Sequence, residues 1–275
     1  MSRSSRRHFL KITTAASTLA LAPAALTARA YAAPEGGWVE LFDGKSLAGW
    51  HKNPVKIGHG TGGNWQVEDG TITGEQDPPG SGNGGILLTD RKFGDFELLI
   101  DLKPDWGICS GLFLRSNDRG QCWQMMVDYH DAGNVGQIYG EGLGGFNTRT
   151  FDINGKLDND NKLVGYSTDK HKSAAEAGLV WTCTPEEWLK AWKVNDWNTA
   201  RVICTGKYAH ITTWLNGQKI CEFDGAISTA PRYEKDKVVE QLGTEGSIAV
   251  QVHGGRNWPS GSKCRWQNIR VRPMS

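Results

Sequence analysis

The chain has 275 residues, and its 31 Lys and Arg nearly balance its 30 Asp and Glu. This balance excludes the strongly basic surface that binding to nucleic acid or to an anionic membrane requires. The 35 glycines and 12 tryptophans, with many short apolar runs and no long amphipathic stretch, favour an all-β protein.

The first 32 residues predict a twin-arginine signal peptide. The run Ser5-Arg6-Arg7-His8-Phe9-Leu10-Lys11 matches that export signal, and a modest apolar run at 12–26 follows it. Pro23 and several Ser and Thr interrupt the apolar run, which is shorter than the roughly 20 residues that span a bilayer. We therefore expect a cleaved leader and no transmembrane anchor in the mature protein.

Two small-residue sites, 28–30 and 30–32, fit the cleavage of this leader, so the mature chain would begin near residue 31 or 33. Export by the twin-arginine translocase predicts a periplasmic or secreted protein. Cleavage removes five of the 31 basic residues and no acidic one, which leaves 26 against 30 and a mildly acidic body. Such a body has no electrostatic footprint for nucleic acid.

Residues 33–275 predict a single β domain. Asp43-Gly44 and Asn216-Gly217 mark tight turns between runs of strand character. Because the length suits one sandwich and long helices are absent, we predict a two-sheet antiparallel β-sandwich or jelly roll. The predicted strands cover 38–42, 65–68, 71–73, 85–89, 96–103, 111–115, 123–129, 136–139, 197–205, 210–215, 218–223, 246–253 and 264–272.

Residues 147–196 predict an insertion rich in Asp, Asn and Lys. It ends in a helix, because Thr184-Pro185-Glu186-Glu187 is a capping box and an apolar stripe of two Trp and one Leu follows. The acidic stretch 152–162 does not match an EF-hand loop, since Lys and Leu occupy a ligand position and the glycine position. Another calcium site on these carboxylates stays an alternative.

Six cysteines remain in the body, and an exported chain can form disulfides. They include no Cys-x-x-Cys pair, which argues against a zinc knuckle or a thioredoxin-like site. Several lie within strand patterns, so we predict mostly buried thiols and allow for one bridge. The cysteines are Cys109, Cys122, Cys183, Cys204, Cys221 and Cys264.

The segment 110–140 predicts two neighbouring strands and the start of a third. In the second strand Gln124, Met126 and Asp128 share one face, and the intervening Trp, Met and Val share the other. One face is therefore apolar, and the opposite face can offer polar side chains to a sugar-sized ligand.

Arg115, Tyr139 and Glu141 are the other polar candidates near this face. Arg115 falls on the same side of its strand as Gly111, opposite two leucines. It is either a salt-bridge partner of Asp128 or a clamp for a ligand oxygen.

The strand at 246–253 places Gln251 and His253 on one face, opposite three aliphatic residues. His253 is either a general base or an ordinary hydrogen-bonded core histidine. The glycine-rich segment after it contains Arg256 and Trp258 and is typical of the rim of a pocket.

Jelly-roll glycosidases place two carboxylates across the scissile bond. Glu97 and Asp101 share a predicted strand, but we expect them on a solvent face because apolar residues separate them. Local sequence thus does not support ordinary glycosidase chemistry, and a pair drawn from different strands stays an alternative.

An ordered set of motifs covers nearly the whole body. It begins with Val39-Glu40-Leu41-Phe42-Asp43-Gly44-Lys45-Ser46-Leu47 and Gly49-Trp50, and it ends with Trp266-Gln267-Asn268-Ile269-Arg270. The set resembles the 3-keto-disaccharide hydrolase domain family, which is similar in fold to concanavalin A-like lectins and glucanases. The motifs between lie at 65–70, 93–98, 110–115, 136–140, 196–198, 215–217 and 246–253.

The resemblance implies cleavage of glycosides oxidised at C3 of the sugar, by hydrolysis or elimination. A C3 ketone acidifies the C2 proton, so a base can remove it and the C1 substituent can leave. We expect His253 or Asp128 as the base and Arg115 as the clamp for the enolate oxygen. Tyr139 and Glu141 would be acids in the pocket.

Gln124, Gln251, Arg256 and Trp258 are the other expected substrate contacts. The sequence requires no cofactor, and calcium or another divalent metal is the alternative. Two rival functions stay open: a noncatalytic carbohydrate-binding module, since fold alone does not define function, and an interaction protein of the cell envelope.

Overall fold

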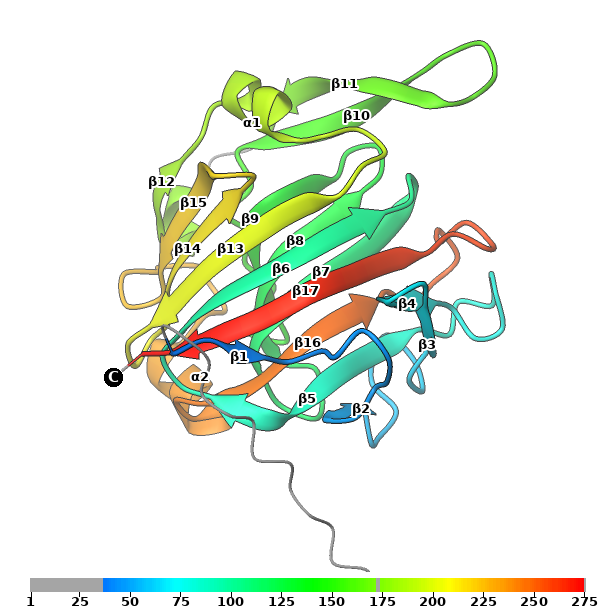
Figure 1. Cartoon of the computed structure of the whole chain (residues 1–275). Coiled ribbons are helices and arrows are strands. Elements are labelled where there is room, and N and C mark those ends of the chain that lie inside the picture. The colour runs from blue at the N-terminus through cyan, green and yellow to red at the C-terminus, as the bar shows by residue number, and fades with distance from the viewer. Residues whose placement is uncertain (1–36, 172–173, 275) are drawn as a thin grey trace, which may run out of the picture. The chain divides into compact units, whose positions relative to one another are not determined.

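The computed structural model describes residues 37–171 and 174–274, which form two antiparallel sheets on either side of an apolar core (Figure 1). The predicted two-sheet antiparallel β-sandwich is confirmed. The predicted leader at 1–32 lies outside the described residues. None of the helices in the described part of the chain is both long enough and apolar enough to cross a membrane.

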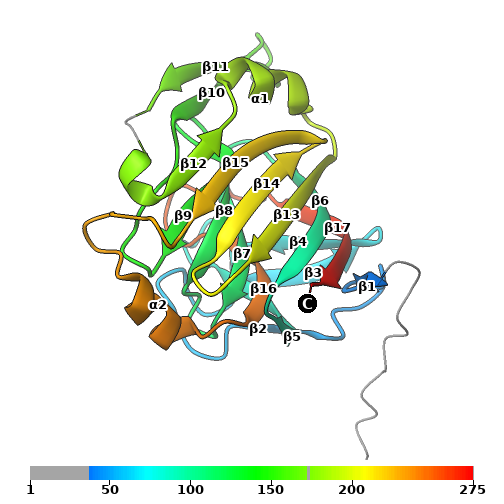
Figure 2. The same cartoon turned by 90° about the vertical axis from the view of Figure 1, so that its left-hand side faces the viewer.

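The larger sheet has nine strands, and Figure 2 shows β12, β15, β14 and β13 side by side within it. In spatial order its strands are β12 (Leu179–Thr182), β15 (Gln218–Asp224), β14 (His210–Leu215), β13 (Asn198–Thr205), β6 (Phe96–Pro104), β17 (Cys264–Pro273), β4 (Thr71–Glu75) and β3 (Asn64–Glu68), with β1 (Val39–Glu40) paired to β17.

The smaller sheet has six strands and carries the polar face predicted from sequence. In spatial order they are β2 (Trp50–Lys52), β5 (Gly85–Phe93), β16 (Gly246–Val252), β7 (Ile108–Ser116), β8 (Cys122–Tyr129) and β9 (Asn134–Glu141).

The period-two pattern of the strands decides which side chains meet in the core. In β8 the alternate residues Trp123, Met125 and Val127 are fully buried between the sheets, as are Ile248 and Val250 of β16. Each fully buried side chain of this size contributes about 1.5–3 kcal/mol by leaving water. The residues between them therefore face outward from the smaller sheet.

The outward face of the smaller sheet is divided into two parts. Phe113, Leu88, Ala249 and neighbouring residues form a second apolar cluster, against which the half-buried Ile57 packs. The other part, around Asp128 and the end of β16, is polar and hollowed.

The insertion at 147–196 ends in α1 (Pro185–Ala191), and its capping box is formed as predicted. The Thr184 side chain accepts from the Glu187 amide, and the Glu187 carboxylate accepts from the Thr184 amide. The segment also forms a hairpin, β10 (Phe151–Leu157) with β11 (Leu163–Lys170), a short 3₁₀ helix (Ala175–Ala177), and β12. The polar composition of this hairpin hid it from the strand pattern.

A second helix, α2 (Lys235–Leu242), was not predicted. Its N-cap residue, Glu234, makes no side-chain capping bond, so the sequence carries no start signal. The turn between β14 and β15 does follow its signal, because Asn216 and Gly217 have φ of 49° and 87°, as a primed turn requires.

All six cysteines lie within the described part of the chain, and none forms a disulfide. The prediction of mostly buried thiols is confirmed, since five are buried and Cys109 is half-buried. The expectation that Glu97 lies in solvent is wrong. Its carboxylate, on the outer face of the larger sheet, is covered by ion pairs with Arg201 and Arg272.

Candidate functional site

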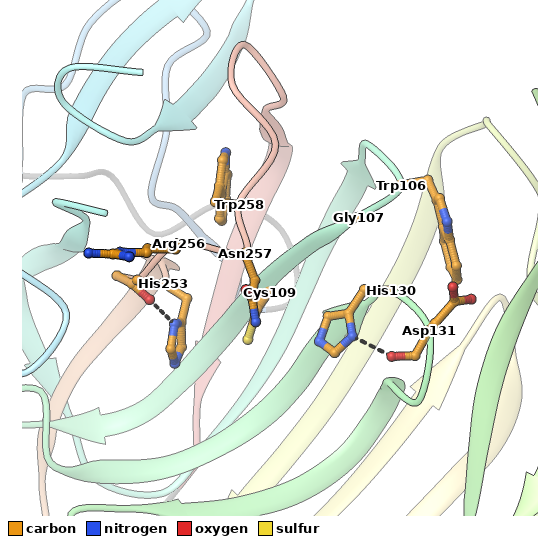
Figure 3. A pocket seen from close by; sticks show the side chains of 11 residues that line it. Trp106, Gly107, Cys109, His130, Asp131, His253, Arg256, Asn257 and Trp258 are labelled. Carbon is orange, nitrogen blue, oxygen red and sulfur yellow. Dashed lines mark hydrogen bonds between the residues drawn. The ribbon is translucent and has the colours of Figure 1, made fainter. Parts of the chain in front are cut away.

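A polar groove follows the outward face of the smaller sheet and opens at one of its ends. It consists of two cavities, of about 530 Å³ and about 250 Å³, and both are lined by Cys109 and His253. Figure 3 shows the larger cavity, where β7 begins and β8 and β16 end. Seven of the nine predicted site residues line the groove: His253, Asp128, Gln124, Tyr139, Glu141, Arg256 and Trp258.

Loops build the wall of the larger cavity. Trp106 comes from the β6–β7 connection, His130 from the β8–β9 turn, and Arg256 and Trp258 from the segment after β16. Trp258 is buried, and its indole Nε1 donates to the Ser262 carbonyl at 2.8 Å. Because Trp106 is only half-buried, its ring is more available than that of Trp258 for stacking on a sugar.

The smaller cavity lies over β8 and β9 and is lined by Gln124, Asp128, Tyr139 and Glu141. This follows directly from the alternation in β8. Trp123 and Met125 point into the core, whereas the residues between and after them face the groove.

Below this cavity lies a layer of buried amides. Gln124 Nε2 donates to Gln251 Oε1 at 3.1 Å, and Gln251 Nε2 lies 3.0 Å from His59 Nε2, to which it donates. Gln251 is fully buried, so it positions Gln124 and His59 and does not contact the cavity itself. The His59 ring in turn lies edge-on to His253, with centroids 4.6 Å apart.

His253 joins the two cavities and has a defined tautomer. Its Nδ1 must donate to the Gly254 carbonyl, which can only accept, and this leaves the lone pair on Nε2. Burial and the neighbouring His59 lower the pKa of His253, although the Gly254 bond and nearby carboxylates oppose this. The ring is therefore neutral and able to take a proton at neutral pH.

Asp128 and Cys109 face each other across β8 and β7. The Cys109 thiol donates to Asp128 Oδ1 at 3.1 Å. Burial raises the pKa of Asp128, against the Cys109 hydrogen bond and the neighbouring His130, His253 and Arg149. Burial and the Asp128 carboxylate raise the pKa of Cys109 well above its ordinary value, so this thiol is not an activated nucleophile.

Tyr139 is half-buried at the same cavity. Burial and the charge of Glu141 raise the pKa of its phenol. Tyr139 therefore keeps its proton at neutral pH and can donate it.

Arg115 does not belong to the groove, and both predicted roles for it are wrong. It is buried at the opposite end of β7 from Cys109, where Nη2 pairs with Asp95 at 2.7 Å and Nε donates to the Gly94 carbonyl. The register against β16 shows the reason: two residues of β7 bulge opposite one, and Arg115 takes φ of +52°. The bulge ends the alternation on which the prediction depended.

Several groove residues were not found from sequence. Pairing β7 with β8 about the 117–121 turn places Cys109 opposite Asp128. His130 follows Asp128 by two residues, just past the end of β8. That signal was available. His59, by contrast, comes from a loop far away in the chain and has no local pattern.

A family match and a curated relative place this sandwich and its polar groove in the class of carbohydrate-active β-sandwich domains similar to glycosyl hydrolases. A model of the 3-keto-α-glucoside-1,2-lyase-like domain matches residues 37–272, and the chain belongs to this family. The family resemblance seen in the sequence is thereby confirmed. A curated relative, the 3-keto-disaccharide hydrolase of Bacteroides thetaiotaomicron, is 25% identical over 265 residues, which cover 86% of this chain and 79% of the relative.

Two solved structures show a partial likeness. A protein of Parabacteroides distasonis, provisionally classed as a glycosyl hydrolase, has a TM-score of 0.49 at 23% identity, covering 86% of this chain and 99% of its own. A carbohydrate-binding module of Bacillus subtilis has a TM-score of 0.40 at 12% identity, covering 81% and 94%.

Proposed function

We propose that this domain cleaves 3-keto-glycosides by removing the C2 proton of the oxidised sugar and expelling the C1 substituent. The observation that carries the proposal is the position of His253. It lines both cavities, and its Nδ1 proton is held by a backbone carbonyl, which leaves Nε2 as the proton acceptor.

The reaction balances with few protein groups. His253 Nε2 takes the C2 proton, and the C–H electron pair is delocalised onto the C3 oxygen as an enolate. The enolate returns the pair to form a C1–C2 double bond, while the C1–O bond breaks and the leaving oxygen takes a proton. Tyr139, which keeps its proton at neutral pH, is the acid of the smaller cavity. Addition of water across the double bond then completes a hydrolysis.

The two carboxylates of the smaller cavity come from positions far apart along neighbouring strands. Asp128 lies opposite Asn134, whereas Glu141 lies opposite Cys122, six residues along β8. Both carboxylates nevertheless line the smaller cavity, and removal of the C2 proton by His253 needs no such pair.

The experiment that tests this function compares a 3-keto-β-glucoside with its unoxidised parent as substrates of the purified protein. We expect aglycone release from the keto sugar and none from the parent. His253→Gln should lower kcat by about 10²–10⁴-fold, the usual contribution of a general base. The control is His210→Gln, which replaces an exposed histidine on the larger sheet.

Equal cleavage of both sugars would contradict the proposal, as would full activity of His253→Gln. Calorimetric binding of the keto sugar without any release would instead indicate a carbohydrate-binding module.

A further inference from the structure

The groove lacks the arginine that was expected to hold the enolate oxygen. Arg115 is paired elsewhere, and Arg149, which lines the smaller cavity, is held by Asp152 and by the Ala132 carbonyl. Arg256 is exposed at the rim of the larger cavity. A reaction through an enolate needs positive charge close to the enolate oxygen, so another source of it is needed.

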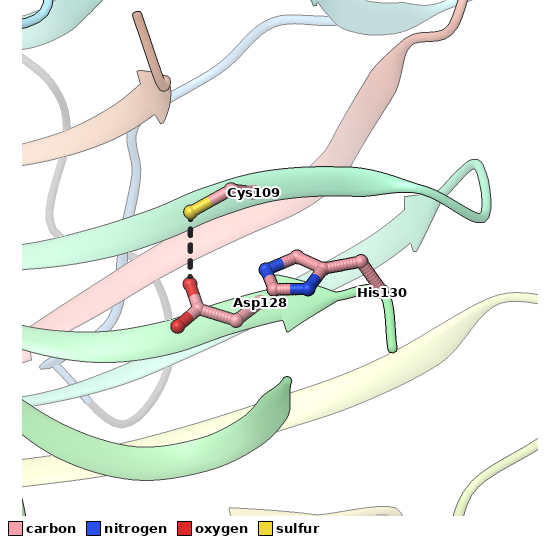
Figure 4. Close-up of side chains that lie close together, drawn as sticks. All are labelled: Cys109, Asp128 and His130. Atoms are coloured by element: carbon pink, nitrogen blue, oxygen red, sulfur yellow. Dashed lines mark hydrogen bonds between the residues drawn. The ribbon is translucent and has the colours of Figure 1, made fainter. Parts of the chain in front are cut away.

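Three side chains of different chemistry converge beside His253. Cys109 and Asp128 are cross-strand partners in β7 and β8, and His130 follows Asp128 by two residues, just past the end of β8 (Figure 4). One atom each, the thiol sulfur, a carboxylate oxygen and an imidazole nitrogen, all lie within 4.8 Å of one another. All three residues are half-buried and line the groove.

The imidazole is already oriented by its backbone. His130 Nδ1 donates to the Asp131 carbonyl at 2.7 Å, which leaves the lone pair on Nε2. Histidine ligands of metals are held in this way, with the non-coordinating N–H bonded to a carbonyl or carboxylate.

Cys109 also differs from the other cysteines. Five of the six are buried and raise no question beyond packing, whereas Cys109 is half-buried at the junction of the two cavities. Its sulfur is the one cysteine ligand that the described groove offers to an ion arriving from solvent.

We propose that Cys109, Asp128 and His130 bind one divalent cation of the zinc class. Sulfur, nitrogen and oxygen donors select zinc or cobalt over calcium and magnesium, which take oxygen ligands. Three protein ligands with one position left for water or substrate is the composition of a catalytic zinc site. Binding would displace the Cys109 thiol proton to solvent, because the ligand is the thiolate.

The cation's role in catalysis rests on the proposed function. When bound, it would polarise the C3 carbonyl of a keto sugar and supply the positive charge that Arg115 does not.

Titration of the chelator-treated full chain with Co²⁺ tests the site without any reference to activity. We expect one equivalent to bind and to produce the absorption band of thiolate-to-cobalt charge transfer. Cys109→Ser should abolish the band, and His130→Gln should weaken Kd for Zn²⁺, measured by calorimetry, by more than about 100-fold. Cys183→Ser, a buried cysteine outside the groove, is the matched control and should keep both.

Absence of the band in the wild-type chain, or its persistence in Cys109→Ser, would overturn the proposal. Thermal melting of each variant shows that it is folded. Cleavage of the keto sugar by a metal-free chain would overturn the cation's role in catalysis and leave the proposed function intact. Cobalt binding by a chain that does not cleave the keto sugar would support the cation site and overturn the proposed function.

Discussion

Glu97, on the outer face of the larger sheet, and Asp128, in the groove of the smaller sheet, differ in how their charge is compensated. On the larger sheet, Glu97 accepts from Arg201 and Arg272, and Asp105 pairs with Arg265 at 2.7 Å. In the groove of the smaller sheet, Asp128 makes no ion pair within the described part of the chain, and its hydrogen-bond donor is the Cys109 thiol.

The pKa shifts of two carboxyl groups express this difference. Burial acts to raise the pKa of Glu97, but the two arginines overcome it, and the pKa is lowered. Burial raises the pKa of Asp128, and its weaker partners do not overcome it. A charge that is buried without full compensation destabilises the fold, so its presence in a cavity points to function, while the compensated group stabilises the structure.

The largest expected effect on stability is that of Arg115. Its charge, like that of Glu97, is compensated by an ion pair, here with Asp95, although Arg115 lies in a strand of the smaller sheet. Arg115→Met should lower the free energy of unfolding by about 3–5 kcal/mol, because it leaves the Gly94 and Gly206 carbonyls without a buried donor. Urea denaturation measures this. The folded fraction should cleave the keto sugar with unchanged KM.

Arg265→Met is the matched control, since Arg265 is partly exposed and pairs with Asp105. It should cost about 1 kcal/mol or less. A large loss of activity in folded Arg115→Met, without loss of stability, would place Arg115 among the functional groups and break the comparison.

A smaller effect is expected at Glu97. Glu97→Gln should lower the free energy of unfolding by about 1–3 kcal/mol at neutral pH, less than a fully buried pair because both arginines are half-exposed. The pKa of Glu97 in the folded protein is below the ordinary value of 4.5, so the contribution of its carboxylate to stability is complete above that pH. It is lost as the pH falls through the folded pKa.

Denaturation of wild type and Glu97→Gln across this acidic range should therefore show two stability curves that converge. Glu68→Gln, which breaks a more exposed pair with Lys263, should change stability by about 1 kcal/mol or less. A Glu97→Gln difference that does not depend on pH would contradict this account of the larger sheet.

Alternation along single strands made much of this molecule predictable. The same pattern that buried Trp123 and Met125 placed Asp128 on the groove, and it placed His253 there from a strand far away in the chain. Prediction failed where the period is broken or where contacts are distant. The bulge at Arg115 depends on how β7 pairs with β16, and His59 contacts His253 from a loop far away in the chain. Neither feature can be predicted from the sequence of a single segment.

The fate of the C2 proton is the most direct test of the central claim, that His253 starts the reaction by removing it. A 3-keto-β-glucoside carrying deuterium at C2 would be followed by NMR over the first turnovers in ordinary water, with the enzyme-free sugar as the reference. The account predicts that deuterium leaves C2 in step with aglycone release, and that His253→Gln slows both together. Release of the aglycone with deuterium retained at C2 would contradict it.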